Sequence, residues 1–288
     1  MGLDLLIDNV NRNKKNNIYN LVYRRKTPKT YFISVIIPVR GRTHLLPTNI
    51  KHLKDAIEKT DKKINITIVE HSYESEIKNL AKEMGLTYYF IKCEKDEVFN
   101  KSIAQNVGAI INKNSEYLMF HDLDCLVLSD FFVNIINELS NKNNLILQNF
   151  RERRLLYLNE RLTSKIINGE CKLSEINLES NEVVKGDTQA PGGSITVQKK
   201  LFFNVGGFDP ELFYGHAPED TFFWKKIETI TQIDSSENEM FHMYHQSLEG
   251  TNPLFSLMFN YYETFLSLPK EKKLEFIDFK SKLILKFI

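Results

Sequence analysis

Cysteines and long hydrophobic runs are scarce in this sequence, and their scarcity excludes several classes of protein. The 288 residues include three cysteines, Cys93, Cys125 and Cys171, whose odd number and wide spacing fit neither a disulfide framework nor a zinc knuckle. No stretch approaches the roughly 18–20 apolar residues of a membrane helix. The N-terminal MGLDLLIDNV also lacks the basic start of a signal peptide. We therefore expect a cytoplasmic protein.

A large net charge of either sign is also missing. Lys and Arg number 38 and Asp and Glu 37, which leaves a formal charge of +1 and gives no indication of a nucleic-acid partner. Residues 11–30 differ locally, because they carry seven basic side chains and no acidic one: Arg12, Lys14, Lys15, Arg24, Arg25, Lys26 and Lys29. Such a run predicts a solvated arm, and the alternative is a weak contact with anionic lipid or an acidic partner.

Apolar, β-branched runs alternate with helical patterns through the first half of the chain. Strands are expected at 32–38, 64–70, 86–92 and 117–120, and helices at about 44–60, 74–84 and 100–111. This alternation indicates an α/β fold with a parallel sheet that helices cover on both faces. Ligands of such sheets bind beyond the carboxyl ends of the strands.

The second half of the chain is less regular. Residues 151–187 are polar without a clear period and predict a flexible loop or lid, whereas short strands are expected around 194–197 and 239–245 and a helix from Glu219. From Pro269 the pattern is helical, with four apolar residues on one face, Phe276, Phe279, Leu283 and Phe287, and with Lys280, Lys282 and Lys286 among them. This pattern predicts a packed terminal helix, and a membrane-surface helix is the alternative.

Two carboxylates follow the fourth predicted strand. If the backbone stays extended, Asp122 and Asp124 point to the same side, and their mutual repulsion favours a cation such as Mg²⁺ or Mn²⁺, which would also bridge a diphosphate. His242 and His245 could complete that site. On a strand, however, a spacing of three directs them to opposite faces, so we expect one histidine rather than both to bind the metal.

Three further groups are candidates for catalysis or binding. Glu219 and Asp220 open a predicted helix, where acids favour the helix dipole or serve as a general base. Gly192 and Gly193 allow either a tight turn or a close approach of the backbone to a ligand. Arg40 and Arg42 follow the first strand, where guanidinium groups suit phosphate or a base edge.

Six segments in this order resemble the β-1,4-galactosyltransferases and the related bacterial polysaccharide and chondroitin-type transferases. They are IIPVRGR (36–42), FNKSIAQNVG (99–108), FHDLD (120–124), PGGSITV (191–197), NVGGFDPELFYGHAPED (204–220) and HMYH (242–245). The resemblance spans about residues 33–255. It implies a GT-A fold, which is a Rossmann-like α/β domain with a mixed, mostly parallel sheet flanked by helices.

The resemblance implies roles for the donor side of the site. Pro38, Arg40 and Arg42 would line the nucleotide pocket, Glu70 would lie near the uridine, Asp122 would lie close to the metal and the diphosphate, and Gly192 and Gly193 would form the turn beside the donor sugar.

The resemblance also implies a metal set and a catalytic base. Asp124 would bind Mn²⁺ (or Mg²⁺) together with His245, which matches the family's metal histidine, whereas His242 stands where the galactosyltransferases have a methionine ligand. Glu219 and Asp220 match the acidic pair of the family, with Asp220 as the base.

Two departures from the family affect the sugar side. The tryptophan-glycine-rich loop of the family is replaced by residues 213–218, so that Tyr214 or His216 must supply the contacts of the tryptophan. Ala190 and Pro191 replace bulkier aromatic residues of the animal enzymes, and we expect the smaller side chains to make room for an N-acetyl group.

The resulting interpretation is a metal-dependent, inverting glycosyltransferase. It would move a hexose or N-acetylhexosamine, with galactose or N-acetylgalactosamine favoured, from a UDP-sugar to a glycan or glycolipid acceptor in bacterial surface polysaccharide synthesis. Its parts would be a basic arm (1–30), a catalytic domain (31–255, with nucleotide-binding and acceptor halves at 31–150 and 186–255) and a helical tail (256–288). Peripheral contact with the inner membrane is possible for such a chain.

Two alternatives are open. One is a catalytically degenerate protein that binds nucleotide-sugar or glycan. The other is a sugar-1-phosphate nucleotidyltransferase, which is disfavoured because no Gly-rich, Lys-containing loop follows the first strand.

Overall fold

The computed structural model describes residues 2–13, 30–141, 145–186, 192–215, 217–246 and 253–287. A seven-stranded sheet with the strand order β10-β6-β9-β4-β1-β2-β3 forms the centre of the molecule. Its strands are β1 (Ile33–Val39), β2 (Ile64–Ser72), β3 (Thr87–Lys92), β4 (Tyr117–His121), β6 (Ile146–Gln148), β9 (Ser194–Gln198) and β10 (Asp234–Ser235). Strands β4, β1, β2 and β3 are mutually parallel, whereas β9 is antiparallel to both of its neighbours.

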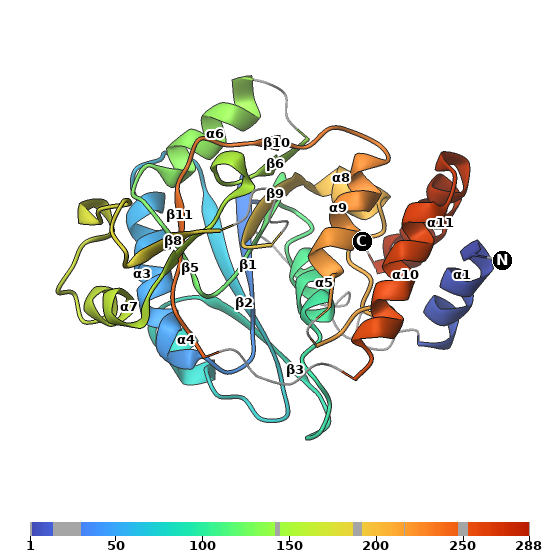
Figure 1. Ribbon diagram of the computed structural model, residues 1–288, viewed down its shortest axis with the longest axis horizontal. Coiled ribbons are helices and arrows are strands. Elements are labelled where there is room, and N and C mark those ends of the chain that lie inside the picture. The colour runs from blue at the N-terminus through green and yellow to red at the C-terminus, as the bar shows by residue number, and fades with distance from the viewer. Residues whose placement is uncertain are drawn as a thin grey trace.

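Helices cover both faces of this sheet (Figure 1). On one side lie α3 (Leu46–Ile57), α4 (Lys78–Glu83), α6 (Phe131–Asn141) and α7 (Glu160–Ile167), and on the other α1 (Gly2–Arg12), α5 (Lys101–Ile111), α8 (Lys199–Asn204), α9 (Glu219–Glu228), α10 (Phe255–Ser267) and α11 (Lys270–Ile284). The expected strands and helices of the first half are therefore confirmed, within a few residues at their ends.

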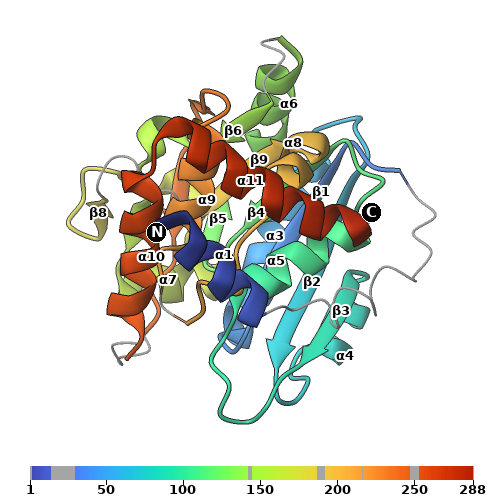
Figure 2. The same cartoon turned by 90° about the vertical axis from the view of Figure 1, so that its right-hand side faces the viewer.

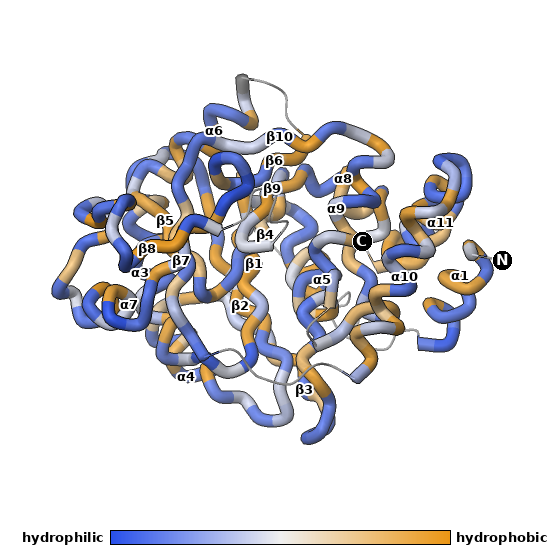
Figure 3. Tube along the Cα trace, viewed as in Figure 1, coloured by the Kyte–Doolittle hydropathy of each residue, from blue (hydrophilic) through white to orange (hydrophobic). Residues whose placement is uncertain are grey.

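Strand β1 shows why the sheet needs both layers. All seven of its residues are buried, and alternate side chains enter different cores: Val35 and Ile37 pack on the side of α3, whereas Ile36 packs on the side of α5. Gly108 lets α5 approach this strand, because a Cβ at that position would lie 2.3 Å from Cγ2 of Ile36. Hydrophobic residues also mark strands β6 and β9 of this sheet in Figure 3, whereas many peripheral loops are polar.

The expectation of a loop or lid at 151–187 is wrong for the described part of that segment. Residues 151–186 contain the 3-10 turns η2 (Arg151–Arg153) and η3 (Leu173–Glu175), helix α7 and the strands β7 (Leu156–Leu158) and β8 (Val183–Lys185). These strands join β5 (Cys125–Val127) and β11 (Met240–His242) in a second sheet of order β5-β11-β7-β8. Strands β7 and β8 have only three residues each, too few to give a clear sequence pattern. The segment is held in place by pairing with β11, which is far away in the sequence.

The C-terminal segment is packed, which decides between its two alternatives. Phe276 and Phe287 are buried, and Phe279 and Leu283 pack partly buried against the same core. Figure 2 shows α11 running diagonally across this layer with α1 beside it, and η4 (Leu285–Phe287) follows α11. Lys280, one of the three lysines that lie among these apolar residues in the sequence, is also buried.

Two further expectations concern the ends of the chain and the membrane. Of the predicted basic arm, residues 14–29 lie outside the described residues, and Arg12 ends α1. Among the helices that the structure describes, we find none whose length and apolar character would let it span a bilayer.

Candidate active site

The polar segments identified in the sequence meet at the carboxyl ends of β1 and β4. Asp122 follows β4 directly, and a turn closed by a hydrogen bond from the Cys125 N–H to the Asp122 carbonyl (3.1 Å) separates it from β5. Because of this turn the backbone is not extended, and the side chains of Asp122 and Asp124 reach different partners. They belong to two adjacent groups, a metal-ligand set around Asp124 and an acid cluster around Asp122.

The metal-ligand set contains Asp124, His242 and His245, whose ligand atoms all lie within 4.8 Å of one another. His245 Nε2 lies 3.1 Å from Asp124 Oδ2, and His242 Nε2 lies 3.5 Å from Oδ1. The expectation that the two histidines point to opposite faces is therefore wrong, because both lie beside Asp124. Strand β11 ends at His242, so the alternation of a strand no longer applies to residues 243–245.

Arg42 is the permanently charged neighbour of this set. Its Nη1 donates to Asp124 Oδ2 at 2.8 Å. Burial alone would raise the pKa of Asp124, but the His245 hydrogen bond and the nearby His242 and Arg42 hold that pKa below its ordinary value. Burial lowers the pKa of His242. An ionised carboxylate and a neutral imidazole are the forms that bind metal ions.

The acid cluster is centred on Lys101, the first residue of α5. Lys101 Nζ lies 2.9 Å from Asp122 Oδ1, 2.8 Å from Asp220 Oδ2 and 3.9 Å from Glu219 Oε1. Burial would lower the pKa of Lys101, but the three carboxylates raise it well above its ordinary value. Sequence reasoning missed this residue, although it stands inside the FNKSIAQNVG segment, because an isolated lysine has no diagnostic spacing.

Two acids of the cluster take up protons more readily than usual. Burial, together with the charges of Asp220 and Asp124, raises the pKa of Asp122 to about 6 even though Lys101 opposes the shift. Burial and the charge of Asp220 raise the pKa of Glu219 to about 8. Glu219 therefore keeps its proton to a higher pH than an exposed glutamate does.

Gly192 and Gly193 lie beside two acids of the cluster, Asp122 and Asp220. The Gly193 N–H donates to Asp122 Oδ2 (3.2 Å), and the Asp122 N–H donates to the Gly193 carbonyl (2.8 Å). Gly193 has φ of 90°, which favours glycine. A Cβ at Gly192 would lie 3.1 Å from Asp220 Oδ2. Gly193 thus makes a tight turn, and Gly192 lets the Asp220 carboxylate come close to the backbone.

The expected nucleotide residues lie at the same edge of the sheet but have separate partners. Pro38 is in β1, and Arg40 Nη1 donates to the Glu97 carbonyl at 2.5 Å. Glu70, in β2, is 1% exposed, and its two carboxylate oxygens accept from the Glu76 N–H (2.8 Å) and the Tyr88 hydroxyl (2.5 Å). Both carboxylate oxygens of Glu70 therefore already accept hydrogen bonds from the protein. Its contact with a uridine stays a prediction.

The residues expected to stand in for the tryptophan and the bulky aromatic residues of the galactosyltransferases are only partly among the described residues. Tyr214 is partly buried against the core, and its N–H lies 3.4 Å from Met258 Sδ. Ala190, Pro191 and His216 lie outside the described residues.

Comparison with known proteins identifies the fold. A family model described as glycosyltransferase-like family 2 matches residues 34–269, and a search of curated proteins finds no match. Solved structures with a similar fold include TarS from S. aureus in complex with UDP (TM-score 0.53, 14% identity, 84% of this chain and 68% of that one). They also include glucosyl-3-phosphoglycerate synthase from Mycobacterium tuberculosis in complex with phosphoglyceric acid (0.54, 10% identity, 83% and 81%).

A third similar structure is a mutant Drosophila β1,4-galactosyltransferase 7 in complex with manganese, UDP-Gal and xylobiose (TM-score 0.50, 14% identity, 78% of each chain). At these identities the likenesses show the fold alone. The predicted GT-A architecture, with its mostly parallel central sheet flanked by helices, is thereby confirmed.

Proposed function

Because this chain belongs to glycosyltransferase-like family 2, and is therefore a glycosyltransferase, we propose that it is a metal-dependent, inverting enzyme that uses a UDP-sugar. The observation that carries the proposal is the adjacency of two groups at one edge of the sheet: Asp124 with two histidines, and Asp220 with Glu219 on Lys101. The similar structures of TarS and the Drosophila galactosyltransferase contain UDP, and UDP-Gal with manganese, respectively, which supports the choice of donor and metal.

The donor atoms around Asp124 fit a divalent transition metal. One carboxylate and two imidazoles lie close enough to share an ion, and they leave coordination positions for diphosphate oxygens. Mg²⁺ prefers an all-oxygen shell, so that Mn²⁺ fits this set better. When bound, the metal would supply positive charge that stabilises the departing UDP.

Asp220 is the general base in this proposal. Its Oδ2 lies 2.8 Å from Lys101 Nζ, and because Gly192 has no side chain the carboxylate can lie directly beside the glycine turn. Asp220 would remove the proton of the acceptor hydroxyl as the hydroxyl oxygen attacks the anomeric carbon, which inverts the configuration. Glu219, with its pKa raised to about 8, would hold its proton at neutral pH and donate a hydrogen bond that orients the acceptor.

For the substrate we propose a hexose or N-acetylhexosamine donor, with galactose or N-acetylgalactosamine favoured, and a glycan or glycolipid acceptor of a bacterial surface polysaccharide. The small residues Ala190 and Pro191 favour the N-acetyl forms. A donor panel in which plain hexoses are preferred over their N-acetyl counterparts would count against this part of the proposal.

The test of this proposal separates binding from turnover. UDP release from UDP-sugars is measured with simple sugar acceptors, for the parent chain and for Asp220→Asn. Because general-base assistance is typically worth about 10²–10⁴-fold, Asp220→Asn should lose at least about 100-fold in turnover and keep its donor affinity. If Asp220→Asn retains near-normal turnover, the base is Glu219 instead. A parent chain that binds donor without any turnover would indicate the degenerate binding protein, and consumption of a nucleoside triphosphate would indicate the nucleotidyltransferase.

Peripheral membrane contact is a further part of the proposal, and α10 supports it better than the C-terminal helix. Leu254, Phe255, Leu257 and Phe259 are all more than one third exposed around the start of α10. A cavity of about 290 Å³ at the other end of α10 is lined by Lys225, Lys270 and Lys273 together with Glu228. Exposed apolar side chains on a helix fit a membrane interface, and the lysines would favour a surface of anionic lipid.

Vesicle sedimentation tests the membrane contact. The parent chain should bind vesicles that contain phosphatidylglycerol, and Phe255→Ser combined with Phe259→Ser should lose this binding. Leu274→Ser, at an exposed leucine of α11, is the matched control. Equal binding of the parent and the double variant would overturn the assignment to α10.

A further inference from the structure

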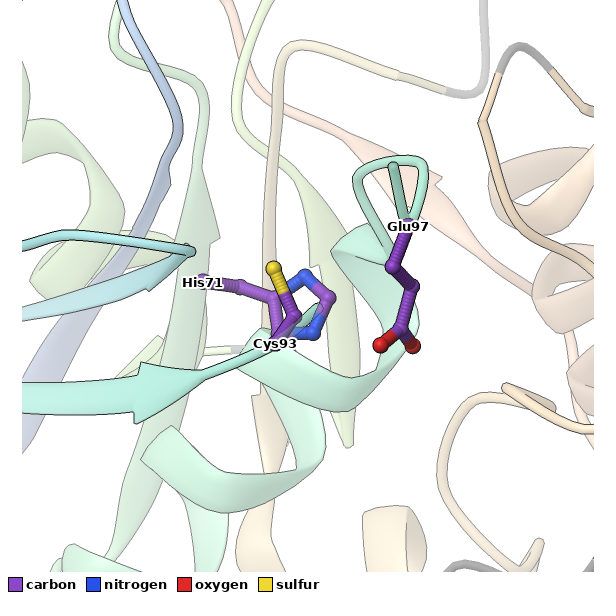
Figure 4. Close-up of side chains that lie close together, drawn as sticks. All are labelled: His71, Cys93 and Glu97. Atoms are coloured by element: carbon purple, nitrogen blue, oxygen red, sulfur yellow. The ribbon is translucent and has the colours of Figure 1, made fainter. Parts of the chain in front are cut away.

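A second cluster of potential metal ligands lies at the ends of β2 and β3. His71 belongs to β2, Cys93 follows β3, and Glu97 lies in the loop that leads to α5. Their ligand atoms all lie within 4.8 Å of one another. Figure 4 shows the His71 ring between the Cys93 sulfur and the Glu97 carboxylate. We propose that these three residues form a zinc site that is separate from the manganese site around Asp124.

The local structure brings these three side chains together and keeps them there. Strands β2 and β3 pair in parallel with His71 opposite Ile91, and the Cys93 N–H donates to the Ser72 carbonyl at 3.1 Å. His71 is 1% and Cys93 6% exposed. The Glu94 N–H lies 3.4 Å from Glu97 Oε2, which orients the carboxylate.

The chemistry of the ligands favours zinc. Thiolate, imidazole and carboxylate are the three side-chain ligands of Zn²⁺, and three protein ligands leave a fourth tetrahedral position for water. The Asp124 set has no sulfur among the three ligands of its cluster. The two sites therefore differ in ligand softness, and a thiophilic ion should prefer the His71 cluster.

Zinc binding requires two changes in the cluster. His71 Nδ1 accepts a hydrogen bond from the Asn100 N–H at 3.2 Å. A metal ion bound to Nδ1 would replace this hydrogen bond. A metal ion bound to Nε2 would leave the ring proton on Nδ1, which could then no longer accept the bond. The hydrogen bond from Asn100 is therefore lost whichever nitrogen binds the metal. Cys93 must also release its thiol proton to solvent. One neutral hydrogen bond contributes far less free energy than a zinc–thiolate site does, so the cluster should still close on the ion.

The position of the site gives the ion a structural role. Asn100 is the N-cap residue of α5, its side chain accepting from the Ile103 N–H at 3.0 Å, and Lys101 of the acid cluster comes next in the chain. A zinc ion would tie β2, the end of β3 and the loop 93–99 together immediately before this helix start. The proposal concerns metal binding alone, and it does not depend on the transferase reaction.

Cobalt titration of the metal-free full-length chain tests the zinc site. Co²⁺ bound to a thiolate gives a sulfur-to-cobalt charge-transfer band, which an Asp–His–His site cannot give. We expect the parent chain to show this band and Zn²⁺ to remove it, because Zn²⁺ binds such ligands more tightly than Co²⁺. Absence of the band at saturating Co²⁺ would overturn the proposal.

Single variants assign the band to its cysteine. Cys93→Ser should lose it, whereas Cys171→Ser, at a more exposed cysteine, should keep it. Cys125→Ser is a second control, because Cys125 Sγ lies 3.9 Å from Asp124 Oδ1. A band that disappears with Cys125 and survives in Cys93→Ser would refute the site. Glu97→Gln should keep the fold and bind zinc at least about 10–100-fold more weakly, and unchanged affinity would exclude Glu97 as a ligand.

Discussion

Lys101 holds three carboxylates that come from two distant parts of the chain. Without its charge, Asp122, Glu219 and Asp220 would repel one another. We predict that Lys101→Met lowers turnover by at least about 100-fold and that the loss of stability is larger at pH 8 than at pH 5. The reason is that the raised pKa values of Asp122 and Glu219, about 6 and about 8, make these two acids neutral at the lower pH. UDP release and thermal unfolding at both pH values measure this effect.

The control for this prediction is Lys101→Arg, which keeps the positive charge and should retain most of the stability. Equal unfolding temperatures of Lys101→Met and the parent chain at pH 8 would show that the lysine does not hold the cluster together.

Glu219 makes a prediction about the pH dependence of stability. Its pKa is raised from 4.5 to about 8 by burial and by the charge of Asp220. Between these values the folded state binds more protons than the unfolded chain, so this group lowers the free energy of unfolding as the pH rises towards 8. Glu219→Gln removes the effect and should be more stable than the parent at pH 8.5 by roughly 1–2 kcal/mol, with a smaller difference at pH 5.

Chemical denaturation at the two pH values tests the Glu219 prediction. Glu263→Gln, at an exposed position of α10, should leave the pH dependence of the parent unchanged. A Glu219→Gln variant whose stability follows the same pH dependence as that of the parent would refute the assigned proton.

The sequence revealed individual site residues where their spacing carried chemical meaning. The Asp122–Asp124 pair, the two histidines and the Glu219–Asp220 pair stood out in this way, and the structure places them at one edge of the sheet. Lys101 could not be found, because its acid partners come from residues 122, 219 and 220 and only folding brings them together. The cluster of His71, Cys93 and Glu97 was hidden for the same reason.

At the scale of elements, a buried ion cluster joins α9 and α11 to the loop between α8 and α9. Lys226 Nζ lies 2.5 Å from Asp209 Oδ2, and Lys280 Nζ lies 2.7 Å from Glu211 Oε2 and 3.4 Å from Asp209 Oδ1. Burial would lower the pKa of Lys280, but Glu211 and Asp209 raise it. The two acids and two lysines balance in charge, so that removal of one leaves an uncompensated buried charge.

We therefore predict that Lys280→Met destabilises the fold by about 3–5 kcal/mol. The matched control is Lys282→Met on the same helix, where the lysine pairs with Asp278 at the surface and should contribute less than about 1 kcal/mol. Urea unfolding measures both variants, and similar losses for the two would contradict the account of the cluster.

Elements were predictable where they were long and locally patterned. The buried runs of β1, β2 and β4 and the helix α5 agree with expectation, because hydrophobic periodicity determines them. The three-residue strands β7 and β8 were not predicted, and β11 was predicted too long, since the stability of these strands comes from pairing with distant segments. The end of β11 at His242 also explains why the expected orientation of the histidines was wrong.

At the scale of the whole molecule, the candidate site lies at the carboxyl ends of β1 and β4, two strands whose side chains enter the cores on both faces of the sheet. Residues on both sides of the chain's midpoint contribute to it, so a bound ligand should stabilise the entire fold. We predict that Mn²⁺ with UDP at about 100 times the dissociation constant raises Tm by roughly 4–5 °C. Differential scanning calorimetry should show no such rise for Asp124→Asn.

The central claim is that a metal at Asp124, His242 and His245 binds a UDP-sugar for transfer. Calorimetric titration of the folded chain with a panel of UDP-sugars, in Mn²⁺ and in EDTA, tests it most directly. We predict that one UDP-sugar binds in the presence of Mn²⁺ and that EDTA abolishes the binding. Binding of no UDP-sugar in Mn²⁺, or equal binding in EDTA, would contradict the claim.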